Sequence, residues 1–421
     1  MKKSLVAITS IFPYGKSEPY FSEELNYLSK IQNLKIILFS LSPRVDDEKK
    51  DIPDNVELNT IFFKGYLFYL VYSFSLLINT ELYKELFRLI RRRKFTKKKF
   101  VKLITYLSRS HYEYNRIKKI LKAEYRFSND SEILFYSYRL EYQAYILKLL
   151  KKEFPKCKFI ARAHRYDLYE EHSKAGYLPF QREIIESLDD VITISNDGYH
   201  YLKSKYPTAK NISLRYLGTK NYLNVKNWST NREKMRVVSC SNITSVKRVE
   251  LIARSLKAIP KSYLVEWVHY GVGNDTDMNK IRKELDGMPC NIKCIFPGHI
   301  DNKELMVKYQ KEVFHVFINV STSEGIPVSI MEALSFGVPV IATNVGGTSE
   351  IISDGYNGYL LESDFSTDKL ANLLCEVKEM EEHKYNTLRC NSRKIWEEKF
   401  SAEKNYMDFC NYLQELMPEE K

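Results

Sequence analysis

Two acidic residues eight positions apart, Glu324 and Glu332, flank the segment of this chain whose residue types are best suited to chemistry. Between them, Gly325, Ile326 and Pro327 form a turn that ends in proline. Proline suits the first turn of a helix, where its missing N–H group would have no partner anyway. Carboxylates accept hydrogen bonds from sugar hydroxyls, and the free N–H groups of a helix start attract phosphate. The pattern therefore predicts a site in which two carboxylates bracket a diphosphate that carries a sugar.

The elements that must position these residues are a strand, a polar loop, a helix and a second strand. Residues 316–320 are apolar and predict the first strand. Gly337 suits the C-terminal cap of the helix, and Pro339 prevents its continuation. Residues 338–342 predict a buried strand, followed by a tight loop at Gly346 and Gly347. With a rise of about 1.5 Å per residue, the two carboxylates flank the start of the helix.

These motifs resemble the donor site of family 4 glycosyltransferases. The shared features are the Glu-x7-Glu spacing, the Glu-Gly-Ile-Pro turn, the Gly-Val-Pro-Val strand and the Gly-Gly loop. Members of that family retain anomeric configuration and have the GT-B fold, in which two doubly wound, Rossmann-like α/β domains face a central cleft. The resemblance implies that Glu324 is catalytic. It also implies a set of donor contacts: Glu324, Gly325, Ile326, Pro327, Val328 and Glu332. The alternative, an ordinary strand–helix unit with two solvated glutamates, leaves the flanking glycines and prolines unexplained.

A basic pair, Lys247 and Arg248, follows another predicted strand of the second half. In many members of the family this loop carries an arginine and, five residues later, a lysine, and both neutralise the donor diphosphate. Lys247 matches the lysine, but Asn242 stands where the arginine would be. We expect Arg248 to supply the second charge, unless its side chain points elsewhere. Two further loops are expected to line the donor pocket through Gly271, Gly298, His299 and Ile300.

In the first half, polar residues follow two predicted strands, at the strand ends where open α/β sheets bind ligands. The resemblance places Gly15 in the glycine loop where acceptor and donor phosphate meet. It matches His164 to the catalytic histidine of the cleft, which donates a hydrogen bond or sits against the developing positive sugar carbon, oriented by Asp167. Arg162 and Asp167 are expected on the acceptor side, and Arg165 is ambiguous.

Strand-like and helix-like stretches alternate twice along the chain, which predicts two parallel sheets covered by helices. The predicted strands are 5–11, 34–41, 133–136, 159–163, 191–195 and 212–216, then 236–240, 264–270, 292–297, 316–320 and 338–342. The predicted domains are an acceptor-binding domain (1–217), a linker (218–232), a donor-binding domain (233–391) and a C-terminal helix crossing back to the first domain (392–421).

Positive charge is concentrated in residues 61–125, which hold sixteen Lys and Arg against four Glu. That excess equals the net charge of +12 of the whole 421-residue chain. An apolar aromatic run, residues 66–74, precedes the basic run 91–99. We expect this amphipathic insertion to dock on an anionic membrane. The alternative is a pair of packed helices with a solvated basic loop. No nucleic-acid motif accompanies the charge, so nucleic-acid binding is disfavoured.

Seven scattered cysteines favour reduced thiols and a cytoplasmic setting. Cys290 and Cys294 lack further ligands for a metal site, and no Asp-x-Asp metal motif is in a fitting place. We therefore expect no metal and no cofactor besides the nucleotide-sugar substrate. The first residues lack a signal-peptide cleavage site, and no stretch predicts a membrane span with confidence. The expected location is the cytoplasm, peripheral on the inner face of the cell membrane.

The resemblance as a whole implies a retaining hexosyltransferase that uses a nucleotide-diphosphate sugar, with UDP-sugars favoured. The implied acceptor is a glycan linked to polyprenyl diphosphate, in the synthesis of exopolysaccharide, capsule or O-antigen. Two alternatives stay open: a GT-B protein that does not transfer, such as a sugar-nucleotide epimerase or an inactive partner subunit, and a basic nucleic-acid-binding protein. The sequence leaves the sugar, the nucleotide, the acceptor, the linkage and the oligomeric state undetermined.

Overall fold

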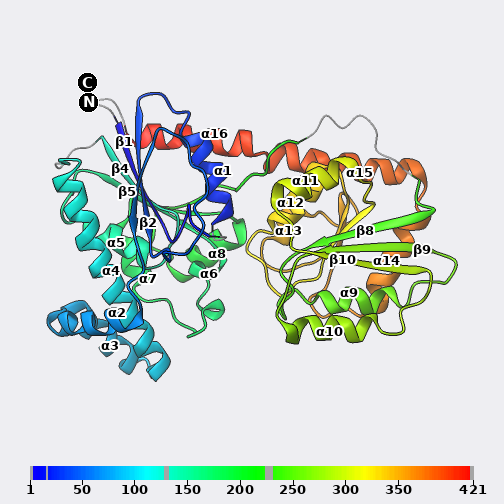
Figure 1. Cartoon of the computed structure of the whole chain (residues 1–421), viewed down its shortest axis with the longest axis horizontal. Helices are drawn as coiled ribbons and strands as arrows, with labels where there is room; N and C mark the ends of the chain where they lie inside the picture. The colour runs from blue at the N-terminus through cyan, green and yellow to red at the C-terminus, as the bar shows by residue number, and fades with distance from the viewer. Residues whose placement is uncertain (1–2, 16–17, 128–131, 223–230, 418–421) are drawn as a thin grey trace. The chain divides into compact units, whose positions relative to one another are not determined.

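The computed structural model describes residues 3–15, 18–127, 132–222 and 231–417. The chain forms two compact units (Figure 1). The first comprises Met1–Arg215 and Tyr406–Lys421, and the second comprises Tyr216–Asn405. Each unit is built on a parallel sheet with helices on its faces (Figure 1).

The described part of the first unit has a seven-stranded sheet in the order β3-β2-β1-β4-β5-β6-β7, with every neighbouring pair parallel. Its strands are β1 (Lys3–Thr9), β2 (Leu34–Leu41), β3 (Val56–Ile61), β4 (Ile133–Ser137), β5 (Lys158–Ala163), β6 (Asp190–Thr193) and β7 (Ile212–Leu214). Its helices are α1 (Pro19–Leu28), α2 (Tyr66–Tyr72), η1 (Ser73–Ile78), α3 (Thr80–Arg91), α4 (Lys97–Ala123), α5 (Tyr142–Leu150), α6 (Arg165–Leu168), η2 (Glu170–His172), α7 (Gln181–Ser187) and α8 (Asn196–Lys205). The central strands are buried along almost their whole length, because helices cover both faces.

The described part of the second unit has a six-stranded sheet in the order β10-β9-β8-β11-β12-β13, again with parallel neighbours. Its strands are β8 (Lys234–Cys240), β9 (Leu264–Tyr270), β10 (Ile292–Gly298), β11 (Val316–Asn319), β12 (Val340–Thr343) and β13 (Gly358–Leu361). Its helices are α9 (Val249–Leu256), α10 (Asp275–Leu285), α11 (Asn302–Lys311), α12 (Val328–Ser335), α13 (Thr348–Ile351), α14 (Thr367–Glu379) and α15 (Glu382–Lys399). The last helix, α16 (Ala402–Leu416), begins in this unit and continues into the first. The predicted pair of doubly wound parallel sheets is confirmed.

The C-terminal part of α16 packs on the sheet of the first unit. Phe409, Leu413 and Met417 are buried there in a cluster with residues of β1, β2 and β4. Most of the predicted linker, residues 223–230, lies outside the described residues, so the predicted boundaries 218 and 232 stay predictions. No helix in the described parts of the chain is long and apolar enough to cross a bilayer.

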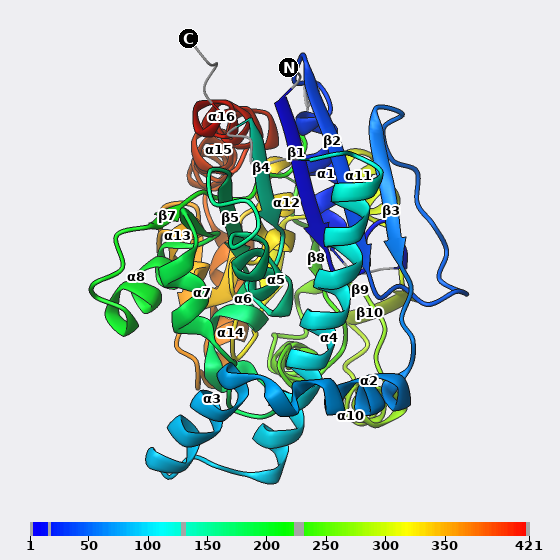
Figure 2. The same cartoon turned by 90° about the vertical axis from the view of Figure 1, so that its left-hand side faces the viewer.

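The basic insertion is helical and starts at the carboxyl end of a strand. β3 ends at Ile61, and α2 begins at Tyr66. Figures 1 and 2 show α2 and α3 beyond the carboxyl ends of the first-unit strands, next to one end of the long helix α4. This is the edge of the sheet at which the loops after β1 and β5 also lie.

Candidate functional site

The helix that carries Glu332 starts immediately after the Glu324 turn. Pro327 is the N-cap of α12, and no side chain caps that end. Gly337 has a φ of 63° and follows the last turn, as expected of a glycine that ends a helix. Seven of the eight residues of α12 are buried, which fixes the helix axis against the sheet. The first N–H groups of the helix are therefore held in a rigid position, where they favour an anion.

Glu324 is a buried carboxylate that is held by three side chains. Its Oε1 accepts hydrogen bonds from Lys247 Nζ at 2.6 Å and from Asn319 Nδ2 at 3.1 Å. Burial alone would raise the pKa of Glu324, but the Lys247 ammonium and the hydrogen bonds from Ser321 and Asn319 outweigh it and lower the pKa below its usual value. Glu324 is therefore ionised at neutral pH, and it joins the loop after β11 to the loop after β8.

The glycine loop after β12 packs against the backbone of the Glu324 turn. Gly346 has a φ of 53°, and a Cβ atom there would lie 2.0 Å from the carbonyl oxygen of Glu324. The N–H group of Gly347 donates to the carbonyl oxygen of Gly325 at 2.8 Å. Only glycine allows this backbone-to-backbone contact, which determines the position of the Glu324 turn relative to the loop after β12.

Glu332 lies deeper, within α12, and has a different environment. Its Oε1 accepts a hydrogen bond from Asn302 Nδ2 at 2.6 Å. Burial raises its pKa to about 7, and the Asn302 bond opposes that rise only in part. Near pH 7 the Glu332 carboxyl is therefore partly protonated, whereas Glu324 is ionised. Asn302 begins α11, thirty residues earlier in the chain, so no local motif could have indicated it.

Arg248, which the sequence predicted as the second phosphate cation, donates to backbone carbonyl groups of its own unit, and a phosphate contact stays a prediction. Its Nε donates to the carbonyl oxygen of Val320 at 2.7 Å, and its Nη1 donates to that of Ser363 at 2.7 Å. The residue is the N-cap of α9 with a φ of 49°, and this backbone turns its side chain toward these carbonyl groups. Arg248 therefore ties loops together. Asn242 is exposed, so Lys247 is the only one of these three residues that faces Glu324 with a charge.

The loops after β9 and β10 meet through their glycines. The N–H group of Gly271 donates to the carbonyl oxygen of Gly298 at 2.8 Å. A Cβ atom at Gly271 would lie 1.8 Å from the carbonyl oxygen of Ser241, so this glycine permits the close packing of two loops. His299 is half exposed, with Nε2 3.8 Å from the Asp301 carboxylate, and Ile300 is partly buried.

A carboxylate fills the cluster of N–H groups after β1. The N–H groups of Ser10, Ile11 and Phe12 donate to the Glu18 carboxylate at 3.0–3.1 Å. Gly15, in the same loop, has a φ of 61°, and its N–H group donates to the backbone carbonyl oxygen of Glu48 at 2.9 Å. No sequence pattern indicates this role of Glu18, because the contact depends on how the loop folds back. A donor contact at Gly15 stays a prediction.

His164 belongs to the first unit and follows β5. Neither of its ring nitrogens has a hydrogen-bond partner within the described residues, and its side chain is 14% exposed. Burial lowers its pKa, so the imidazole is neutral at pH 7. Its Nδ1 lies 3.8 Å from Asp167, which is longer than a hydrogen bond. Asp167 instead binds the backbone N–H groups of His164 and Leu140.

Arg162 and Asp167 are interior residues, and their predicted acceptor contacts stay predictions. Arg162 is 1% exposed, and its guanidinium lies 2.9 Å from Glu24. It also donates to Tyr136 Oη at 2.9 Å and to the carbonyl oxygen of Arg215 at 3.3 Å. Asp167 is fully buried. Both side chains use their polar atoms inside the unit, where they hold β5 and the His164 loop.

The described residues contain no group of three or more His, Cys, Asp or Glu side chains that could hold a metal ion.

The structure brings together Lys247, Glu324 and the start of α12 in the second unit, with Glu332 buried in the same helix. Asn319, Ser321 and Asn302, which hold the two glutamates, were not predicted. Asn319 and Ser321 stand at the carboxyl end of a strand, and that position could have indicated them.

Comparisons with known proteins match this part of the chain. Residues 223–395 match the sequence model of the family described as glycosyl transferases group 1. A poly(glycerol-phosphate) alpha-glucosyltransferase of Bacillus subtilis is 30% identical over 152 residues, which are 34% of this chain and 21% of that protein. The GtfA subunit of a UDP-N-acetylglucosamine–peptide N-acetylglucosaminyltransferase of Streptococcus gordonii is 28% identical over 132 residues, 31% of this chain and 25% of that protein. The matches thus span about a fifth to a quarter of the length of these two relatives.

Solved structures resemble the whole chain at low sequence identity. Sucrose-phosphate synthase of Thermosynechococcus elongatus superimposes with a TM-score of 0.70 at 17% identity, over 98% of this chain and 99% of that one. HepE of Anabaena, in complex with UDP and glucose, gives a TM-score of 0.63 at 14% identity, over 98% and 99%. These likenesses confirm the GT-B fold.

Proposed function

We propose that this chain is a retaining glycosyltransferase that moves a hexosyl unit from a nucleotide-diphosphate sugar, a UDP-sugar, to a glycan acceptor. The observation that carries the proposal is the Lys247–Glu324 pair beside the uncapped start of α12. A cation, a rigid set of N–H groups and an ionised carboxylate are the groups that a sugar diphosphate needs. A fold neighbour that was solved with UDP and glucose supports the same ligand class.

Lys247 and α12 stabilise the departing diphosphate. The ammonium group of Lys247 has three N–H donors, of which Glu324 uses one. As the glycosidic bond breaks, negative charge grows on the diphosphate, and donors that are already in position stabilise that charge without reorganising. Glu324 accepts hydrogen bonds from the sugar, and Glu332 accepts one from a further hydroxyl of the donor. The departing phosphate itself takes the acceptor proton, so no protein nucleophile is required.

His164 contributes a neutral imidazole to the acceptor side. Both of its ring nitrogens lack a protein partner among the described residues, so one can donate and the other can accept a hydrogen bond. A neutral ring fits a role beside a sugar carbon that becomes positive, because an imidazolium would repel it. We assign it to the orientation of the reacting sugar.

The acceptor in this proposal is a glycan on a polyprenyl-diphosphate carrier, in cell-surface polysaccharide synthesis at the inner face of the membrane. Large apolar side chains are exposed on α2 and η1: Tyr66, Leu67, Leu70, Val71, Phe74, Leu77 and Ile78. So many exposed apolar groups in one segment mark an interaction surface, and the adjoining basic run favours an anionic leaflet. The segment lies at the carboxyl ends of the first-unit strands, where the acceptor is expected (Figure 2).

One observation favours a second candidate, a partner subunit that binds donor without transfer. Asn242 replaces the expected arginine, and Arg248 is engaged with carbonyl groups, so Lys247 is left as the cation of this loop. A weaker positive field lowers the stabilisation of a leaving diphosphate.

The test is the turnover of a panel of nucleotide sugars by the full chain, with and without a lipid-linked saccharide acceptor. We expect acceptor-dependent transfer, lowered by about tenfold or more in Glu324→Gln, because a hydrogen bond to a charged group contributes about 1.5–3 kcal/mol. Glu362→Gln removes an exposed glutamate of the same unit and serves as the matched control. Donor consumption that does not depend on acceptor would indicate an epimerase or hydrolase. Donor binding without turnover would indicate the inactive subunit.

A further inference from the structure

Helix α3 carries three longitudinal stripes of different chemistry. Its inner stripe is buried and consists of Leu82, Glu85 and Leu89. An outer apolar stripe consists of Tyr83, Phe87 and Ile90, which are 52%, 65% and 60% exposed. A basic stripe beside it consists of Lys84, Arg88 and Arg91. Each stripe follows the spacing of one helix face. A helix in water would not expose three large apolar side chains in line, so its outer side has a partner.

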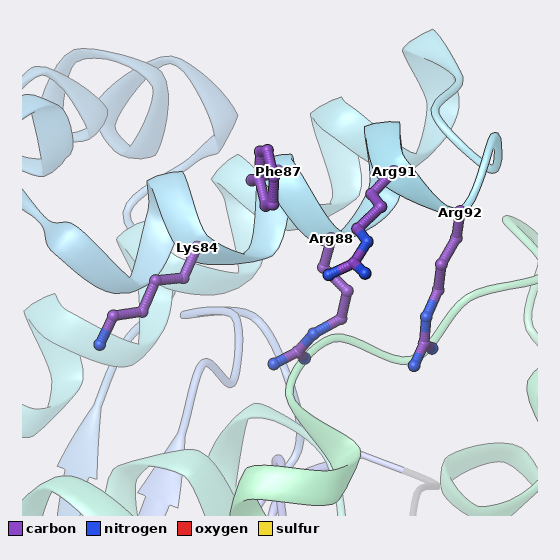
Figure 3. A pocket seen from close by; sticks show the side chains of 5 residues that line it. All are labelled: Lys84, Phe87, Arg88, Arg91 and Arg92. Carbon is purple, nitrogen blue, oxygen red and sulfur yellow. The ribbon is translucent and has the colours of Figure 1, made fainter.

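The basic stripe lines a pocket of about 440 Å³ together with the helix cap. Lys84, Phe87, Arg88, Arg91 and Arg92 line this pocket. Figure 3 shows Arg88, Arg91 and Arg92 reaching from the same side of the helix, while Phe87 points from the other side. Its volume is within the range of small-molecule sites.

Two of the pocket cations are available to a ligand. Arg88 is paired with Glu85 at 2.6 Å and also with Glu183, and Lys84 is paired with Glu81 at 3.2 Å. The side chains of Arg91 and Arg92 are exposed, and neither side chain has a hydrogen bond or an ion pair within the part of the chain that the structure describes. The charge of Arg92 also acts on Glu85, whose pKa is raised by burial and lowered in part by Arg92. Their two guanidinium groups present planar N–H donors that match phosphate oxygens bidentately.

The helix dipole does not account for this concentration of charge. The C-terminal end of a helix carries about half a negative charge, which one nearby cation neutralises. The last turn of α3 and the four residues after Ile90 supply Arg88, Arg91, Arg92, Arg93 and Lys94. Since Arg88 already sits in the last turn, the charge of Arg91 and Arg92 is in excess. Excess cations beside exposed apolar side chains suit the boundary between lipid headgroups and acyl chains rather than a soluble anion.

We propose that Arg91 and Arg92 form a binding site for the phosphomonoester or diphosphate headgroup of a membrane lipid, while Tyr83, Phe87 and Ile90 enter the acyl region. Two guanidinium groups that line one pocket match a headgroup with two negative charges better than a phosphodiester with one. This inference rests on the proposed function only in taking the same face as the membrane-facing one. It does not depend on donor binding or on turnover.

The test compares binding of the full chain to two kinds of phosphatidylcholine vesicle. One contains phosphatidic acid, and the other contains phosphatidylserine at equal total charge. We expect the wild-type chain to bind the phosphatidic acid vesicles about tenfold more tightly, as expected for about one additional charged hydrogen bond. The Arg91→Gln/Arg92→Gln variant should bind both kinds equally. The Lys97→Gln/Lys98→Gln variant loses the same charge from the exposed start of α4 and should bind both more weakly but keep the preference.

Three results would overturn the proposal. Equal wild-type binding to both vesicles would show that the pocket does not recognise the headgroup. Loss of the preference in Lys97→Gln/Lys98→Gln would assign it to general charge. A preference for phosphatidic acid that persists in Arg91→Gln/Arg92→Gln would assign the recognition to other residues of the chain. Equal melting temperatures of the variants and the wild type verify folding. Because the assay contains no nucleotide sugar, absence of transferase activity would leave its outcome unaffected.

Discussion

Lys247 is the residue on which the proposed donor site depends most, because it is the direct cationic partner of the buried Glu324 carboxylate. In Lys247→Ala, burial would act on Glu324 with only neutral partners left, and the pKa of Glu324 would rise. We expect affinity for UDP to fall by about ten- to a hundredfold, since a hydrogen bond to a charged group contributes about 1.5–3 kcal/mol. Calorimetric titration measures this.

Two controls accompany that titration. Lys283→Ala removes an exposed lysine of α10 in the same unit and should leave UDP affinity unchanged. Lys247→Arg keeps the charge and should restore part of the affinity. If Lys247→Ala binds UDP as tightly as Lys283→Ala does, Lys247 has no role at the diphosphate.

Glu332 makes folding stability depend on pH. Its pKa is about 7 in the folded chain against an ordinary value of 4.5, so the folded state binds the proton more tightly than the unfolded state. The stability that this group contributes is complete below about pH 4.5 and is lost as pH rises through 7. A difference of this size corresponds to about 3 kcal/mol at most.

The Glu332→Gln variant isolates this effect. It keeps an oxygen that can accept the Asn302 hydrogen bond, but it has no proton to lose. Urea unfolding at pH 5 and pH 8 should show the wild type losing stability relative to Glu332→Gln as pH rises, whereas Glu362→Gln should follow the wild type. A constant difference between wild type and Glu332→Gln across this range would contradict the assigned pKa.

At the scale of residues, spacing predicted the positions of Glu324, Glu332 and Lys247 relative to a helix start, and the structure brings Lys247 to Glu324. Spacing did not predict the direction of the Arg248 side chain or the contact of Asn302 with Glu332. Both depend on loops that are far apart in sequence, and side-chain direction there is set by tertiary packing. The same reason explains Arg162, which lies at the carboxyl end of β5, as a ligand residue would, but points into the core.

At the scale of elements, the glycine loop after β12 determines where the Glu324 turn stands. We expect Gly346→Ala to reduce UDP affinity and to destabilise the chain by clearly more than Gly355→Ala. Both glycines have positive φ, which costs alanine about 1–2 kcal/mol. Only at Gly346 would the new Cβ also collide with backbone, at 2.0 Å from Glu324 O, whereas nothing lies within 4 Å at Gly355. Thermal unfolding and UDP titration of the two variants measure the difference. Equal losses would mean that the Gly346 contact does not position the site.

All strands in the middle of the two described sheets could be predicted from the sequence, whereas two of the four edge strands could not. β2 and β9 have the predicted bounds, because buried parallel strands are continuous apolar runs. β3 and β13 were missed. They lie at the edges of their sheets, where β3 has polar residues in its middle and β13 has four residues. An amphipathic insertion was expected at residues 61–125, but the exposure of one whole apolar stripe on α3 required the structure.

At the scale of the whole molecule, the alternation of strands and helices was sufficient to predict two doubly wound units, since each predicted strand run supplies one sheet. The proposed transfer relies on Lys247 and α12 for positive charge and needs no divalent ion. We therefore expect transfer from the nucleotide sugar to continue at an unchanged rate in excess chelator. Activity that disappears in chelator and returns with magnesium or manganese would show that these groups are insufficient.

The anomeric configuration of the transferred sugar tests the central claim most directly. The full chain is incubated with a UDP-α-hexose and a lipid-linked saccharide, and the product is examined by proton NMR. Retaining transfer predicts that the hexosyl unit appears on the acceptor in the α configuration. A β-linked product, or an acceptor that gains no sugar while every donor of the panel stays intact, would contradict the account.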